Sequence, residues 1–168
     1  MTRVGVVGAA GKMGKTLVAM IRESPDLDLA AAVDQPGQQA IGQDAGTVAN
    51  VGETGVFIAD DLAQVVADID VLIDFTIAVA TEKSMEICHS AGTRMVIGTT
   101  GLSESQIVRL DEISSSVPVV FASNYSIGVN ATFQLVEMAA SIFGDTVDVE
   151  IIESHHRHKV DAPSGTAI

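Results

Sequence analysis

The chain has 168 residues, of which 47% are hydrophobic and 18% are charged. This composition is that of one folded domain, or one and a part, and it excludes a disordered chain. The formal net charge of −13, from 22 acidic and 9 basic residues, excludes a protein built to neutralise the phosphates of a nucleic acid.

Neither a membrane span nor a disulfide is expected. No apolar stretch approaches the roughly 18 residues of a membrane helix. The chain runs from Met1 straight into a strand-like segment without an apolar signal region, which predicts a cytoplasmic location. Cys88 is the single cysteine, which excludes an internal disulfide, and its place in a helical pattern over residues 81–91 predicts a buried thiol.

Strand-like and helix-like segments alternate over the first 121 residues. Helical patterns cover residues 13–21, 61–67, 81–91 and 103–114, and residues 35–55 are predicted to be a loop with at most a short element. Ser103 and Gln106 have the spacing of a capping box, which places a helix start there. Strands are predicted at residues 3–7, 27–33, 56–58, 71–75, 95–97 and 117–121. This alternation predicts an α/β fold in which helices cover both faces of a parallel sheet.

The pattern changes after residue 121. Residues 122–128 form a polar connector, and residues 130–143 have helical periodicity. Residues 147–152 alternate valine and isoleucine with acidic residues, which predicts a strand with one wet face. We place a domain boundary near residue 126, giving domains 1–126 and 127–168. The last residues resemble the first turn of a helix, so we expect the second domain to be incomplete and the chain to be truncated or a fragment.

Three glycines form the first motif with a chemical meaning. Gly8, Gly11 and Gly14 follow a strand and open a helix, as in a dinucleotide-binding loop, although the first two are one residue further apart than usual. Asp34 ends the second strand about 20 residues later, where an acidic residue can bind ribose hydroxyls. The alternatives are a plain glycine-rich turn and an aspartate that merely starts the turn at residues 35–37.

Further polar or permissive segments follow other predicted strands. Residues 98–101 (Gly-Thr-Thr-Gly), 122–125 (Ala-Ser-Asn-Tyr) and 75–76 (Phe-Thr) all lie at carboxyl ends. Ligands of open α/β sheets bind at these ends. Together with the glycine loop, these segments fit one cofactor crevice better than unrelated turns.

A basic run, residues 155–159 (His-His-Arg-His-Lys), stands out in this acidic chain. Cations gathered in one place indicate an anion-binding site, and His and Lys can both donate protons near neutral pH. Residues 164–166 (Ser-Gly-Thr) add hydroxyl and N–H donors suited to carboxylates. One alternative is a solvated loop. A metal site is disfavoured, because adjacent histidines on a loop seldom converge and no cysteine supports them.

Four blocks, residues 7–14, 98–101, 124–130 and 153–166, carry a specific resemblance across the whole chain. The sequence resembles the dihydrodipicolinate reductase family, whose members run considerably further. The resemblance implies a Rossmann-type domain followed by the start of a second α/β domain for substrate binding and tetramerisation. It also implies a homotetramer that uses NADH or NADPH to reduce 4-hydroxy-tetrahydrodipicolinate, a small dicarboxylate, to tetrahydrodipicolinate in the diaminopimelate route to lysine.

The resemblance also assigns residues to roles. His155 takes the position of a proton donor and acceptor, and Lys159 that of a proton donor. The substrate-binding positions are His156, Ser164, Gly165 and Thr166. The cofactor-binding positions are Gly8, Ala9, Ala10, Gly11, Lys12, Met13, Asp34, Gly98, Thr99, Thr100, Ala122, Ser123, Asn124 and Tyr125.

Gln35 departs from some members of that family, in which an arginine at this position serves the 2′-phosphate of NADPH. The change, next to Asp34, favours NADH. Two other functions stay open on the sequence alone. One is a different Rossmann oxidoreductase, such as an amino-acid dehydrogenase. The other is a non-catalytic dinucleotide-binding module, which would need neither His155 nor Lys159.

Overall fold

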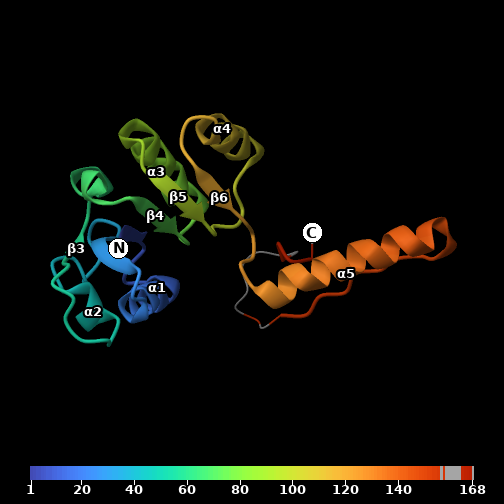
Figure 1. Cartoon of the computed structure of the whole chain (residues 1–168), viewed down its shortest axis with the longest axis horizontal. Coiled ribbons are helices and arrows are strands. Elements are labelled where there is room, and N and C mark those ends of the chain that lie inside the picture. Colours follow the sequence, from blue (N-terminus) through green and yellow to red (C-terminus); the bar gives the residue numbers. More distant parts are fainter. Residues whose placement is uncertain (156, 158–163, 168) are drawn as a thin grey trace. The chain divides into compact units, whose positions relative to one another are not determined.

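Residues Met1–Phe121 fold around one sheet of six parallel strands (Figure 1). The computed structural model describes residues 1–155, 157 and 164–167. The strand order, β3-β2-β1-β4-β5-β6, reverses direction between β1 and β4, and the fold class predicted for this part is confirmed. The strands are β1 (Thr2–Val7), β2 (Leu27–Val33), β3 (Ile58–Ala59), β4 (Val71–Asp74), β5 (Arg94–Ile97) and β6 (Val119–Phe121).

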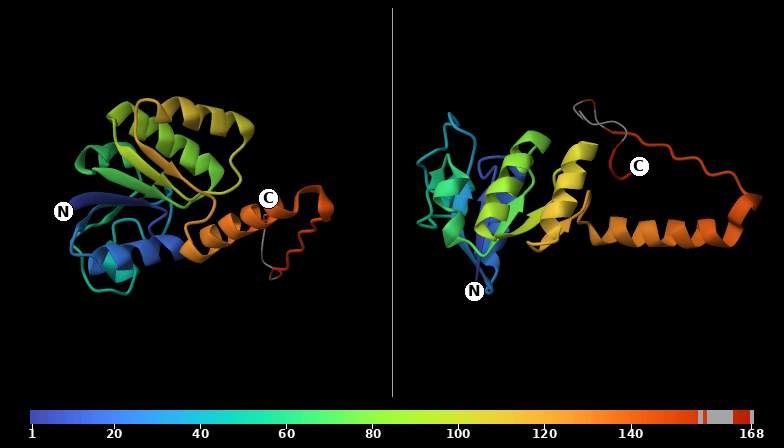
Figure 2. Two further views of the ribbon diagram at one scale, coloured as in Figure 1. Left: turned by 45° about the vertical axis from the view of Figure 1, so that its right-hand side comes forward. Right: turned by 90° about the horizontal axis from the view of Figure 1, so that it is seen from above.

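Helices cover both faces of the sheet (Figures 1 and 2). On one face, α1 (Lys12–Glu23) and α2 (Ala45–Val48) join a core cluster with the inward side chains of β1 and β2. On the other face, α3 (Ala78–Ala91) and α4 (Glu104–Ser114) join a second cluster with β4 and β5. The helix predicted at residues 61–67 is instead two 3₁₀ turns, η1 (Leu62–Gln64) and η2 (Val66–Asp68).

The second cluster contains the single cysteine. Cys88 on α3 has no exposed surface and packs with Leu72 and Met85, which are equally buried. Burial, together with the nearby charge of Asp74, raises the pKa of the Cys88 thiol to about 12. The predicted buried thiol is therefore confirmed, and it is chemically inert at neutral pH.

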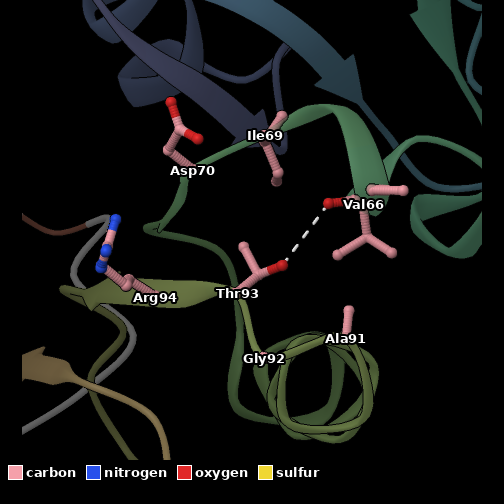
Figure 3. Close-up of a pocket in the computed structure, with 8 residues that line it drawn as sticks. Val66, Ile69, Asp70, Ala91, Gly92, Thr93 and Arg94 are labelled. Atoms are coloured by element: carbon pink, nitrogen blue, oxygen red, sulfur yellow. Dashed lines mark hydrogen bonds between the residues drawn. The ribbon is translucent and has the colours of Figure 1, made fainter.

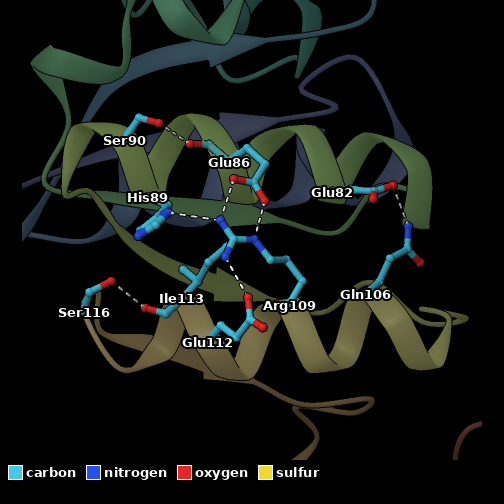
Figure 4. A network of polar contacts seen from close by, with 9 residues as sticks. All are labelled: Glu82, Glu86, His89, Ser90, Gln106, Arg109, Glu112, Ile113 and Ser116. Atoms are coloured by element: carbon cyan, nitrogen blue, oxygen red, sulfur yellow. Dashed lines mark hydrogen bonds and ion pairs between the residues drawn. The ribbon is translucent and has the colours of Figure 1, made fainter.

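A capping box begins α4, as the sequence predicts. The Ser103 hydroxyl accepts a hydrogen bond from the Gln106 backbone at 3.3 Å, and the Gln106 side chain accepts one from the Ser103 backbone at 2.9 Å. The same Gln106 amide donates to Glu82 on α3 at 3.0 Å (Figure 4). One side chain therefore caps its own helix and links it to the neighbouring helix.

Arg109 makes the second link between α3 and α4 (Figure 4). Its Nε lies 2.6 Å from Glu86 on α3, and its Nη1 lies 2.8 Å from Glu112 on α4. The hydrogen bonds to Glu86 and Glu112 raise the pKa of Arg109, and the hydrogen bond from Arg109 lowers that of Glu86. All three groups are partly exposed, so this network orients the helices more than it stabilises them.

The second unit, Ala122–Ile168, is built around one long helix, α5 (Ile127–Phe143). The Ser126 hydroxyl accepts a hydrogen bond from the Val129 backbone at 3.4 Å, so the helix begins three residues before the predicted range. A 3₁₀ turn, η3 (Gly144–Thr146), follows it. None of the residues of α5 is buried. The domain boundary near residue 126 stays a prediction.

The prediction of a strand at residues 147–152 is wrong. This segment is irregular and exposed, and the described residues of the second unit contain no strand beside which it could form a ladder. A strand needs backbone partners on a neighbour, which alternation alone does not supply. In the part of the chain that the structure describes, no helix has the length and apolarity to cross a membrane.

Candidate functional site

Four strands place their candidate residues at one edge of the sheet. Val7 pairs with both Val33 and Asp74, and Asp74 pairs with Ile97. The residues that follow these strand ends therefore emerge side by side, at the point where the strand order reverses. This is where open α/β sheets bind their ligands. The structure thus brings together the glycine loop, Asp34, residues 75–76 and residues 98–101, as predicted.

The glycine loop is shaped by close backbone contacts. Gly8 has a φ of +69°, a conformation that favours glycine. A side chain at Gly14 would collide with the carbonyl oxygen of Gly8 and lie 2.7 Å from the Cα of Ala9. The missing side chain therefore lets α1 pack directly on the turn that follows β1.

The start of α1 suits an anion. Gly11 is its N-cap and offers no side chain to the first backbone N–H groups, and the first turn contains no acidic residue. Lys12 and Met13, the next two residues, are exposed. An uncapped helix start beside a glycine turn presents N–H groups and partial positive charge, which fits the pyrophosphate of a dinucleotide.

Asp34 connects the end of β2 to the glycine loop. One carboxylate oxygen accepts a hydrogen bond from the Ala10 backbone at 2.8 Å, and the other accepts one from the Gln35 backbone at 2.8 Å. Asp34 therefore starts a turn and also fixes the loop. Each oxygen keeps a second lone pair, so the side chain can still accept hydrogen bonds from a ribose diol.

A buried polar network that sequence reasoning missed supports this edge. Asp74 at the end of β4 is only 1% exposed, and its Oδ1 accepts hydrogen bonds from the Thr76 backbone at 2.9 Å and the Thr76 hydroxyl at 2.6 Å. The Thr99 hydroxyl lies 3.3 Å from Asp74 Oδ1 and accepts from Thr81 at 2.7 Å. The sequence signal is an acidic residue inside an apolar strand, which must find hydrogen-bond donors when it is buried.

This network holds the end of β4 between two candidate cofactor loops. The Thr76 methyl would lie 2.7 Å from a side chain at Gly8, and the Phe75 ring occupies the space where a side chain at Gly98 would project. The Gly98 backbone also donates to the Asp74 carbonyl at 2.8 Å. Because its hydroxyl is committed to the network, Thr99 would meet a cofactor through its backbone.

In the second unit, one carboxylate contacts both the predicted proton donor and the predicted substrate-binding turn. Glu153 Oε2 lies 3.1 Å from His155 Nδ1, and the two Glu153 oxygens accept from the Ser164 backbone at 3.0 and 3.1 Å. Thr166 donates its backbone N–H to the Ser164 hydroxyl at 3.4 Å and accepts from the Asn124 amide at 3.3 Å. Sequence reasoning gave Glu153 no role.

Other predicted site residues also lie in the second unit. Ala122, Ser123 and Tyr125 belong to the second unit with Asn124. Gly165 lies in a turn closed by a 2.7 Å hydrogen bond from the Ala167 backbone to the Ser164 carbonyl. His156 and Lys159 lie outside the described residues.

A pocket of about 250 Å³ lies at the opposite edge of the sheet, near the amino ends of β4 and β5 (Figure 3). Two of the polar side chains that line it already have partners. Asp70 pairs with Arg3 at 3.0 Å, and the Thr93 hydroxyl lies 3.4 Å from the Val66 carbonyl. We therefore place the candidate site at the carboxyl ends of the strands.

Comparisons with known proteins identify a family. A family model described as dihydrodipicolinate reductase, N-terminus, matches residues 2–125, and one described as dihydrodipicolinate reductase, C-terminus, matches residues 128–168. The 4-hydroxy-tetrahydrodipicolinate reductase of Acinetobacter baumannii is 52% identical over 99% of this chain and 60% of its own length. That of Alkalilimnicola ehrlichii is 53% identical over 99% and 62%. The chain therefore spans about three fifths of the length of these relatives.

Solved structures agree with these matches. A dipicolinate-bound dihydrodipicolinate reductase from Paenisporosarcina sp. TG-14 superposes with a TM-score of 0.76 at 29% identity, over 99% of this chain and 63% of the other. GenD2 from gentamicin A biosynthesis, in complex with NAD, has a TM-score of 0.63 at 20% identity over 80% and 38%, which shows a shared fold alone. The chain belongs to the dihydrodipicolinate reductase family.

Proposed function

We propose that the whole protein reduces 4-hydroxy-tetrahydrodipicolinate to tetrahydrodipicolinate with a nicotinamide dinucleotide, in the diaminopimelate route to lysine. The observation that carries the proposal is that one chain has both parts such a reductase needs. The first unit has a glycine loop, an uncapped helix start and Asp34 at one edge of a parallel sheet. The second unit has His155 beside a turn rich in N–H and hydroxyl donors.

The dinucleotide, when bound, supplies the hydride. In the proposed site, the loop from Gly8 to Met13 receives the pyrophosphate, because its N–H groups and the start of α1 favour negative charge. Asp34 accepts hydrogen bonds from the ribose hydroxyls. Gly98–Thr100 and Ala122–Tyr125 complete the cofactor site.

Reduction of a C=N or C=C bond also needs a proton. We assign its donation to His155, with Lys159 as a second donor. The carboxylates of the substrate are assigned to His156, Ser164, Gly165 and Thr166, whose hydroxyls, backbone N–H groups and positive charge suit a small dicarboxylate. The run from His155 to Lys159 is the densest group of basic residues in a chain of net charge −13.

We further propose that the enzyme prefers NADH to NADPH. Asp34 can accept hydrogen bonds from a ribose diol but repels a 2′-phosphate, and Gln35 brings no compensating charge. The missing charge-assisted contact is worth about 1 kcal/mol or more. Fluorescence titration with both cofactors tests this preference. Tighter NADPH binding would show that Lys12 or another cation serves the phosphate.

The activity itself is tested by following nicotinamide oxidation by the whole gene product. Oxidation of NADH that depends on the cyclic product of aspartate semialdehyde and pyruvate supports the proposal. Oxidation that needs a different substrate would favour another Rossmann oxidoreductase, such as an amino-acid dehydrogenase. Binding of NADH without turnover of any such substrate would favour a non-catalytic dinucleotide-binding module.

Assembly and location belong to the same proposal. We expect a cytoplasmic homotetramer, joined through the second domain as the family resemblance implies. The exposed apolar side chains of α5 support a covering partner, since Leu135 and Ile142 are 66% and 75% exposed. Light scattering coupled to gel filtration measures the mass in solution, and a stable monomer would contradict the proposed assembly.

A further inference from the structure

One carboxylate, that of Glu153, contacts both the predicted proton donor and the turn predicted to bind substrate. His155 Nδ1 lies 3.1 Å from Glu153 Oε2. The Ser164 backbone N–H, eleven residues away in sequence, donates to both Glu153 oxygens at 3.0 and 3.1 Å. Ser164 is 7% exposed, whereas the His155 side chain is 40% exposed. Glu153 therefore connects the accessible His155 imidazole to the backbone of the buried Ser164.

We propose that Glu153 is a positioning residue that sets the tautomer and orientation of His155 relative to the turn at residues 164–166; the inference rests on the proposed function. A carboxylate accepts hydrogen bonds and has none to give. The His155 nitrogen that faces Glu153 must therefore be Nδ1–H. The other nitrogen, Nε2, is left for proton transfer.

The proton balance follows from this arrangement. Protonated His155 carries hydrogen on both nitrogens. The substrate loses its 4-hydroxyl group and a ring hydrogen as water, which leaves a C=C bond conjugated to the C=N bond. His155 gives its Nε2 proton to one carbon of that C=C bond, and the other carbon would take the hydride that the bound dinucleotide supplies. His155 is then neutral with its proton on Nδ1, still facing Glu153, and it regains the Nε2 proton from water. No rotation of the ring is needed between turnovers.

Glu153→Gln separates this role from simple support of the turn. Glutamine has one carbonyl oxygen, and the Ser164 N–H requires an acceptor. The oxygen then faces Ser164, and the amide NH₂ faces His155 Nδ1, which must accept a hydrogen bond. The neutral ring is forced to carry its proton on Nε2, and the protonated ring meets an N–H donor instead of a carboxylate. The form that donates a proton is thereby disfavoured.

The first experiment is steady-state kinetics on the whole gene product with NADH and the cyclic substrate. Glu153→Gln is expected to lower kcat by about 10²-fold, the lower end of what a positioned general acid contributes. The Kd for NADH should stay within about twofold, since Glu153 lies outside the cofactor site proposed above. Glu150→Gln is the matched control, because Glu150 is exposed and shows no hydrogen bond or ion pair with a described residue. A rise in KM with kcat unchanged would show that Glu153 only supports the turn, and it would overturn the proposal.

The second experiment reads the tautomer directly and needs no substrate. Nitrogen-15 NMR of histidine-labelled protein distinguishes protonated from unprotonated ring nitrogens, and the loss of one signal in His155→Gln assigns the residue among the four histidines. We expect neutral His155 to carry its proton on Nδ1 in the wild type and on Nε2 in Glu153→Gln. A wild-type proton on Nε2 would overturn the inference. Failure of the wild type to turn over the substrate would instead overturn the proposed function.

Discussion

The contact between Gly14 and the turn after β1 leads to a quantitative prediction. In Gly14→Ala the new methyl group would overlap the Gly8 carbonyl oxygen and lie 2.7 Å from the Cα of Ala9 and 2.8 Å from the carbonyl carbon of Gly8. These are backbone atoms that cannot rotate away. Ordinary contacts between carbon atoms begin at ~3.5 Å, so α1 must move away by about 1 Å.

The cost of this movement can be estimated. Overpacking of this kind costs about 1–3 kcal/mol, and the better helix propensity of alanine returns up to about 1 kcal/mol. We expect a net loss of about 1–2 kcal/mol in the free energy of unfolding. In a chain of this length the melting temperature should fall by about 2–8 °C. The displaced start of α1 should also weaken NADH binding by about tenfold or more.

Two further glycine variants separate stability from binding. Gly11→Ala needs no unusual backbone angle, and its methyl group would lie 3.1 Å from the Gly8 oxygen, which a small adjustment relieves. Its free energy of unfolding should stay within about 0.5 kcal/mol of that of the wild type. It should nevertheless bind NADH poorly, because the methyl group would occupy space that the pyrophosphate needs. In Gly128→Ala on α5, the new methyl group would lie 3.8 Å from the Ser126 hydroxyl and would touch no other described residue, so this variant should lower neither stability nor NADH binding.

Thermal unfolding followed by circular dichroism and fluorescence titration with NADH measure the two effects. If Gly14→Ala melts and binds like the wild type, α1 does not pack on the turn as described. If Gly11→Ala keeps full affinity for NADH, the cofactor does not approach this backbone, and the glycine loop has another purpose.

Four other predictions concern the core and the length of the chain. With its pKa at about 12, Cys88 should resist alkylation at pH 8 until the protein unfolds, because only about one thiol in 10⁴ is ionised. The raised pKa also predicts a stability contribution that is complete below the unfolded pKa near 9 and lost as the pH rises toward 12, measurable by urea denaturation. Thr81→Val removes the hydroxyl donor to Thr99 and should cost about 1–2 kcal/mol in the same assay; an unchanged midpoint would mean that the network adds no stability. A protein of verified 168-residue mass should bind NADH but turn over substrate poorly, and full activity would contradict this.

Local signals predicted most of the first unit. The apolar strands and the capping box at Ser103 depend on neighbours within a few residues, so the sequence contains what is needed to recognise them. The glycine loop was recognisable for the same reason, because its turn and its helix start are adjacent. Asp34 required one further step, the inference that parallel strands end at a common edge.

The supporting residues could not be predicted in this way. The network around Asp74 joins the end of β4 to Thr81 on α3 and to Thr99 after β5, so it depends on three segments meeting in space. Glu153 reaches Ser164 across residues that themselves contain the basic run. In both cases the sequence shows the candidate residues, whereas the groups that contact them become apparent only when distant segments are placed together.

The failed strand at residues 147–152 shows the physical limit of pattern analysis. Alternation indicates which side chains would lie on the same face of a strand, and by this pattern Val149 and Ile151 would lie on one face. A strand also needs at least one neighbouring strand to pair with its N–H and C=O groups, and that neighbour comes from elsewhere in the fold. Within the described residues of the second unit no such partner exists, and Val149 and Ile151 are 67% and 71% exposed. In the first unit, by contrast, every strand has at least one parallel neighbour that supplies these backbone partners.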